Sequence, residues 1–77
     1  MAIIRIIDHA IYPRQALSEA RVAYKDYCIV RVEPASGNKA RLSIEVSSSH
    51  LNNKREVVLN FMNFMLDKAL EIQLTSL

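Results

Sequence analysis

The chain is poor in glycine and proline, the residues that interrupt helices and strands: its 77 residues include one glycine and two prolines, and it has no tryptophan. Hydrophobic residues make up 51% of it, so it is too apolar and too poor in linker residues to be disordered. We expect a single folded domain, residues 1–77, with short connections. A domain of this size buries only about 60% of the surface of its unfolded chain, so a partner would help to stabilise it.

The chain also lacks the residue patterns of a metal or catalytic site. Its single cysteine, Cys28, excludes an internal disulfide and a zinc site built from several cysteines. His9 and His50 show no HxxxH or HxH spacing and no neighbouring cluster of carboxylates. We therefore expect no metal, no cofactor and no catalytic residue. The pair Asp8-His9 is expected in a loop at a strand end, His50 in a loop or cap, and Cys28 in the core.

No long hydrophobic run and no excess of one charge is present. Arg5 and Asp8 interrupt the N-terminal run MAIIRIIDHA, so we expect no signal peptide. No segment approaches the roughly 18 apolar residues of a membrane span. Ten basic and eight acidic residues are interspersed and give a net charge of +2, which is too weak a balance to indicate nucleic acid. We expect a cytoplasmic protein that binds neither membranes nor nucleic acid.

The first half of the chain predicts a strand and a helix. β-branched residues favour a strand over residues 3–8, with Ile4 and Ile6 facing the core. Pro13 suits the first turn of a helix because it has no N–H to donate and a fixed φ. Apolar residues then recur at three- and four-residue spacing, which predicts a helix over roughly 13–26. The opposite side of that helix is expected to be solvated.

An alternation of period two follows and predicts a β-hairpin. Residues 27–33 place Cys28, Val30 and Val32 on one face, and residues 41–47 repeat the alternation. The stretch PASGNKA between them holds the only glycine of the chain, so the hairpin loop is expected to be longer than two residues.

The longest periodic segment predicts a second helix after the polar stretch SSSHLNNK. One of Ser49, Asn52 and Asn53 is expected to cap it. Its wide apolar stripe consists of Val57, Val58, Phe61, Met62, Met65, Leu66, Ala69 and Leu70. Further apolar residues lie partly off this stripe, namely Phe64, Ile72, Leu74 and Leu77. Such surplus apolar surface is typical of an oligomer or partner interface. The alternative is a final strand over IQLTSL, although no turn residue separates it from the helix.

The element order β-α-β-β-α predicts an α+β two-layer sandwich. A right-handed crossover, with the third strand between the first two, gives a three-stranded sheet of order 1-3-2 with two helices on one face. The face toward the helices is expected to carry Ile4, Ile6, Cys28, Val30, Val32, Leu42, Ile44 and Val46. The other face of the sheet is left uncovered.

The uncovered face is expected to present charges of both signs: Arg5, Arg31 and Arg41 beside Glu33 and Glu45. Opposite charges on neighbouring strands would keep such a face soluble. Alternatively, an extended peptide could add to the exposed edge of the first or second strand. A nucleic-acid platform would interleave aromatic residues with the basic ones, and none is expected on this face.

Two segments, IYPRQALSEARVAYKDYCIVRVE and FMNFMLDKALEIQ, resemble the small HxsD proteins of the His-Xaa-Ser system. Those proteins have an Ile/Leu-Tyr step before a short helix, an Ala-Tyr pair near its end, a Tyr-x-Val strand and a C-terminal helix signature. The matching positions here are Ile11, Tyr12, Ala23, Tyr24, Tyr27, Val30, Asp67 and Leu70. The C-terminal signature appears as FMLDKALEI and lacks the family's first Asn, its Tyr and its Arg-Glu ending.

The resemblance implies an accessory protein encoded with radical SAM proteins and a His-Xaa-Ser repeat polypeptide, in peptide maturation. This chain contains no such repeat, so it would be the helper rather than the substrate. The main hypothesis is a small non-catalytic protein that docks a peptide or a modifying enzyme. The residues predicted to bind a partner are Arg5, Arg31, Arg41, Phe64, Ile72 and Leu74.

Two other hypotheses stay open. One is a homodimer of structural or regulatory role, with Phe64, Ile72 and Leu74 at its interface. The other is a small enzyme that uses His9 or Cys28.

Overall fold

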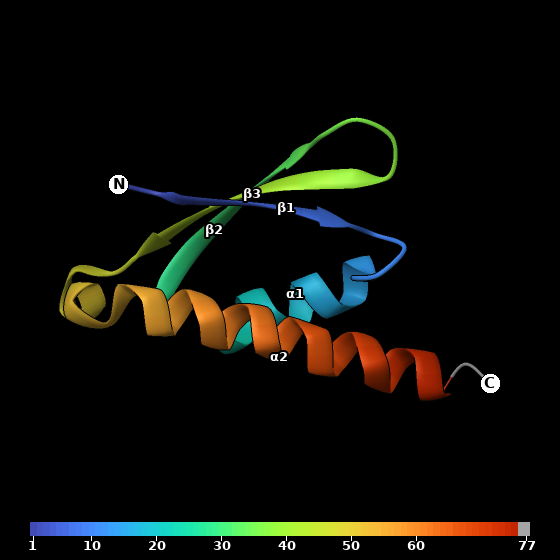
Figure 1. The fold of residues 1–77 in the computed structure, drawn as a ribbon. Helices are drawn as coiled ribbons and strands as arrows, with labels where there is room; N and C mark the ends of the chain where they lie inside the picture. The colour runs from blue at the N-terminus through green and yellow to red at the C-terminus, as the bar shows by residue number, and fades with distance from the viewer. Residues whose placement is uncertain (76–77) are drawn as a thin grey trace.

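A computed structural model describes residues 1–75 of the chain. Its elements are β1 (Ile3–Asp8), α1 (Arg14–Ala23), β2 (Cys28–Pro34), β3 (Lys39–Val46), the 3₁₀ helix η1 (Ser48–Asn53) and α2 (Lys54–Thr75). The strands form an antiparallel sheet of order β1-β3-β2. Both helices lie on one side of the sheet (Figure 1). The predicted α+β fold and the strand order 1-3-2 are confirmed.

Helix α1 begins at Arg14, one residue after the predicted start, with Pro13 directly before it, and ends at Ala23, three residues before the predicted end. The backbone N–H groups of Tyr27 and Cys28 both donate to the carbonyl of Tyr24, at 2.9 and 3.0 Å. These bonds close a turn that directs the chain into β2. The helix buries a narrow stripe of small and apolar side chains, namely Ala16, Leu17 and Ala20. Its opposite side is exposed, as predicted.

The loop of the β2–β3 hairpin spans residues 35–38 and is longer than two residues, as expected. Gly37 adopts φ of +64° within it, a left-handed conformation that costs glycine little because it has no Cβ. The N–H of Ala35 donates to the carbonyl of Lys39 at 2.9 Å and closes the loop. The only glycine of the chain therefore lies where the backbone requires it.

Helix α2 extends to Thr75, so the described part of IQLTSL is helical and the alternative of a final strand is wrong there. Residues 76–77 lie outside the described part of the chain. The polar stretch before α2 forms η1, which contains all three candidate capping residues and leads straight into α2. Asn53, one of the three candidates, directly precedes Lys54, the first residue of α2.

The core lies between the sheet and the two helices. Its largest fully buried side chains are Leu42 and Ile44 of β3 and Phe61 and Met65 of α2. The other buried apolar residues are Ile7, Ala16, Leu17, Ala20, Cys28, Val30, Ala40, Val46, Val57, Val58 and Ala69. The alternation predicted for β2 and β3 is confirmed except at Val32, which is 36% exposed.

The predicted orientation of β1 is wrong. Ile7 is only 2% exposed, whereas Ile4 and Ile6 are 38% and 54% exposed. The register pairs Arg5 with the buried Leu42, and directly opposed residues of an antiparallel pair share a face. The helix-facing side of β1 therefore carries Ile3, Arg5 and Ile7.

Side-chain length explains the orientation of β1. Each face of the strand has two isoleucines and one charged residue, so apolar content alone does not choose between them. Arg5 lies on an edge strand, where its long side chain reaches water, and its Nη1 donates to the carbonyl of Ile4 at 2.9 Å. Asp8 is too short to do this, and its Oδ1 instead accepts the N–H of Ala10 at 2.8 Å in the following turn.

Candidate functional site

The two histidines lie in different turns. The Nδ1–H of His9 donates to the carbonyl of Tyr12 at 3.0 Å and closes the turn before α1, so His9 lies in a loop as expected. His50 lies in η1, with its ring centroid 4.8 Å from that of Tyr27. Within residues 1–75, no group of three or more His, Cys, Asp or Glu side chains could hold a metal ion.

Cys28 lies in the core and is 5% exposed, and its burial raises the pKa of the thiol. Since only the thiolate reacts, we expect a thiol reagent to label native protein far more slowly than protein unfolded in urea. The raised pKa also means that the unfolded chain ionises first as the pH rises. The stability that the buried, protonated Cys28 thiol contributes is present below the ordinary thiol pKa and is lost as the pH rises above it. Rapid labelling under native conditions would contradict this placement.

The uncovered face of the sheet carries charges and exposed isoleucines together. Glu33 lies directly opposite Arg41, with 3.9 Å between Oε1 and Nη1 and both side chains about half exposed or more. Such exposed pairs contribute about 0–1 kcal/mol. Arg31 lies on this face as predicted, but Arg5 does not, because β1 presents its other side here. Ile4, Ile6 and Ile29 are the exposed apolar residues of the face.

The residues predicted to bind a partner do not form one surface. Arg31 and Arg41 lie on the uncovered sheet face, whereas Arg5 lies on the helix side of β1. Phe64 and Ile72 are partly buried against the core. Leu74 is 71% exposed.

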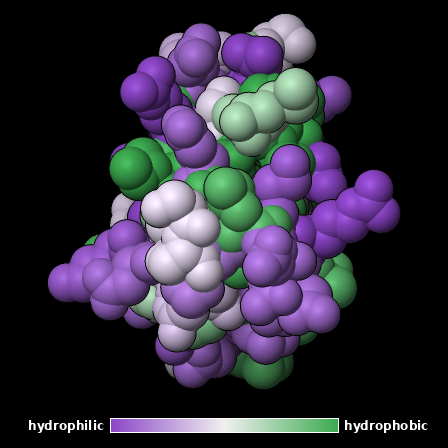
Figure 2. Space-filling model, turned by 90° about the vertical axis from the view of Figure 1, so that its left-hand side faces the viewer, coloured by the Kyte–Doolittle hydropathy of each residue, from purple (hydrophilic) through white to green (hydrophobic). Residues whose placement is uncertain are grey.

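The surplus apolar surface of α2 comes mainly from other residues than those predicted. Leu59, Leu66, Leu70 and Leu74 are 59%, 38%, 50% and 71% exposed, and their spacing places them on one side of the helix. Figure 2 views the end of the molecule where the N-terminus lies, and it shows apolar areas separated by hydrophilic side chains.

The outer edge of β1 has no neighbouring strand within residues 1–75. The N–H of His9 donates to the carbonyl of Asn38 at 3.0 Å, which fixes the alternation of the antiparallel ladder. Odd-numbered residues of β1 bond to β3, so the N–H and C=O groups of Ile4 and Ile6 point away from the sheet. The bond from Arg5 to the carbonyl of Ile4 lies on this edge.

A groove of about 720 Å³ runs between β1 and α2. Its apolar lining comes from Ile3, Val58, Leu59 and Met62, and its charged lining from Arg5 and Arg55. These lining residues, all in the described chain, include no carboxylate. The groove therefore joins a free strand edge, an apolar wall and two guanidinium groups.

Sequence reasoning missed the groove, although one signal was present. Arg55, Leu59 and Met62 follow each other at four- and three-residue spacing beside the buried stripe of α2, which places them on one side of the helix. With the correct orientation of β1, this spacing would have placed them beside Arg5.

No family model matches the chain, and comparisons with curated proteins and with solved structures found no match. The resemblance to HxsD proteins therefore stays a prediction. Within residues 1–75, the helices are too short or too polar to cross a membrane.

Proposed function

We propose that this protein is a small non-catalytic binding module that docks an extended acidic peptide segment in the groove between β1 and α2. The observation that supports this proposal is the edge of β1, which has no neighbouring strand within residues 1–75, beside an apolar groove whose charged lining residues in the described chain are Arg5 and Arg55. An added strand obtains affinity from main-chain hydrogen bonds and specificity from the pockets that take alternate side chains.

The backbone of Ile4 and Ile6 would bond to the added strand. Every second side chain of that strand would then face the groove, where apolar groups contact Leu59 and Met62. The guanidinium of Arg5 would leave the carbonyl of Ile4, which frees that carbonyl for the peptide. It would then pair with an acidic side chain, since guanidinium and carboxylate groups match geometrically.

The resemblance to HxsD proteins favours a particular context for such a module. The docked segment would belong to a peptide under maturation or to the enzyme that modifies it. A neighbouring gene for a radical SAM protein would support this context, and its absence would weaken it.

A homodimer is the second candidate function. It is favoured by the exposed leucines on one side of α2, Leu59, Leu66, Leu70 and Leu74. Sedimentation of the wild-type protein over a range of concentrations distinguishes a dimer from a monomeric binding module.

The peptide proposal predicts a specific effect of Arg55→Glu. The titrant is a short peptide that alternates apolar and glutamate residues, followed by NMR of backbone amides. We expect shifts in β1 and around Leu59 and Met62. Reversing one of two charges that face the peptide should weaken binding about tenfold, or about 1.4 kcal/mol.

Arg31→Glu is the matched control, because Arg31 is also exposed but lies on the uncovered sheet face. It should leave the affinity nearly unchanged. Equal losses for both variants, or shifts confined to β2, would contradict docking in this groove.

A further inference from the structure

A second pocket lies between the end of α1, η1 and α2. It has a volume of about 550 Å³ and is lined by the rings of Tyr24, Tyr27, His50 and Phe64 and by the carboxylate of Glu56. It shares no lining residue with the β1–α2 groove. A ligand of this pocket is therefore independent of the peptide proposed above.

The aromatic rings of the pocket hold one another in place. The centroid of Tyr24 lies 5.7 Å from that of Tyr27 and 5.8 Å from that of Phe64. Tyr24 also meets the fully buried Phe61 edge-on, with 5.9 Å between centroids. These spacings lie within the range of favourable aromatic pairs. The pocket therefore has a fixed aromatic wall anchored to the core.

The charge of the pocket lining is negative. Glu56 supplies a carboxylate, and no lysine or arginine is among the lining residues, all of which belong to the described chain. The ion pairs found within residues 1–75 join Arg41 to Glu33 and Lys68 to Glu71. Glu56 is in neither of them.

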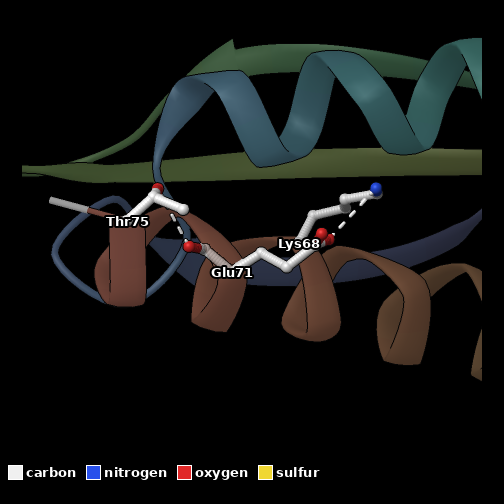
Figure 3. Close-up of polar contacts among 3 residues, drawn as sticks. All are labelled: Lys68, Glu71 and Thr75. Carbon is white, nitrogen blue, oxygen red and sulfur yellow. Dashed lines mark hydrogen bonds and ion pairs between the residues drawn. The ribbon is translucent and has the colours of Figure 1, made fainter.

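The protein's own Lys68 side chain makes contacts of the same kind. The Nζ of Lys68 lies 5.6 Å from the ring centroid of Phe64, within the range of a cation–π contact. It also lies 3.1 Å from Oε2 of Glu71, as Figure 3 shows, and this hydrogen bond raises the pKa of Lys68. An aromatic face and a carboxylate together hold this ammonium group.

We infer that the pocket binds the cationic side chain of a lysine or arginine from a partner polypeptide. The rings of Tyr24 and Tyr27 line the pocket beside Glu56, which provides the opposite charge. Tyr27 is 42% exposed and Glu56 is exposed, so a side chain carried on another chain can reach both groups from outside. A neutral side chain would lack both the charge attraction to Glu56 and the cation–π attraction of the rings.

The test uses a single-residue probe, N-acetyl-lysine N′-methylamide, with its Nε-acetylated form as the neutral control. Titration by NMR should shift the ring signals of Tyr24 and Tyr27 and the side-chain signals of Glu56. We expect the charged probe to bind at least about fivefold more tightly than the neutral one, since the attraction depends on the charge.

Two variants separate the contribution of the carboxylate from that of the aromatic ring. Glu56→Gln and Tyr27→Leu should each weaken the charged probe about fivefold, because both side chains face it and both are accessible. The matched control is Glu45→Gln, which removes a carboxylate on the uncovered sheet face and should leave the affinity for the charged probe unchanged. Circular dichroism confirms that each variant is folded.

Three results would overturn the inference. The first is equal binding of the charged and neutral probes. The second is a loss with Glu56→Gln but none with Tyr27→Leu, which would indicate charge attraction without an aromatic site. The third is binding of choline without binding of the lysine probe, which would indicate a small free cation instead of a polypeptide.

Discussion

Replacing Phe61 with alanine is expected to lower the free energy of unfolding by about 3–5 kcal/mol. Phe61 lies in the first half of α2 and is fully buried, and its ring meets Tyr24 at an interplanar angle of 87°. Its truncation removes apolar burial and leaves a cavity between the helices and the sheet. Small domains have only about 5–15 kcal/mol of stability in total, so this variant should be partly unfolded at low denaturant. Urea unfolding followed by circular dichroism measures the loss.

Phe64→Ala is the matched control for Phe61→Ala. Phe64 is on the same helix and contacts the same tyrosine, with 5.8 Å between ring centroids, but it is only partly buried. Its truncation should cost about 1–2 kcal/mol, since less apolar area is lost. Equal losses in the free energy of unfolding for Phe61→Ala and Phe64→Ala would indicate that the centre of the core lies elsewhere on α2.

The substitution Ile7→Ala is expected to cost about 2–4 kcal/mol, whereas Ile6→Ala should cost less than about 1 kcal/mol. The two isoleucines are neighbours in one strand, and they differ mainly in burial, at 2% and 54% exposed. Intrinsic strand propensity changes equally in both variants, so their difference reports burial. Thermal and urea unfolding of the pair measure it.

A larger loss of stability for Ile6→Ala than for Ile7→Ala would indicate that Ile6, and not Ile7, faces the helices. A one-residue change in how a strand is paired moves every side chain to the other face of the sheet. Similar losses for both residues would indicate that a partner covers the outer face of β1.

The outcome for β1 shows where sequence periodicity stops being informative. In β3, polar and apolar residues alternate from Ala40 to Val46, so one face is clearly the buried one. In β1 both faces are mostly isoleucine, and the choice depends on what Arg5 and Asp8 can reach. That depends on which strand lies at the edge and on the turn that follows, and neither is local to the strand. The end of α1 was missed because Tyr24 and Tyr27 continue its apolar spacing.

The candidate sites were harder to predict than the fold. The β1–α2 groove brings Arg5 and Arg55 together from opposite halves of the chain, so it follows only after the sheet order and the face of β1 are known. Phe64 and Ile72 lie partly off the apolar stripe, which predicts exposure, but they pack against the core. Exposure on α2 falls instead on the side of Leu59 and Leu70.

The strand order also governs how the sheet assembles and opens. β2 and β3 are joined by a short loop, so they can pair early, whereas α1 and β2 separate β1 from β3 along the chain. Closing that longer loop costs entropy and slows the pairing of β1 with β3. Since β1 has one neighbouring strand, it can detach while the hairpin stays paired. Amide groups of β3 that bond to β1 should then exchange with solvent before those that bond to β2.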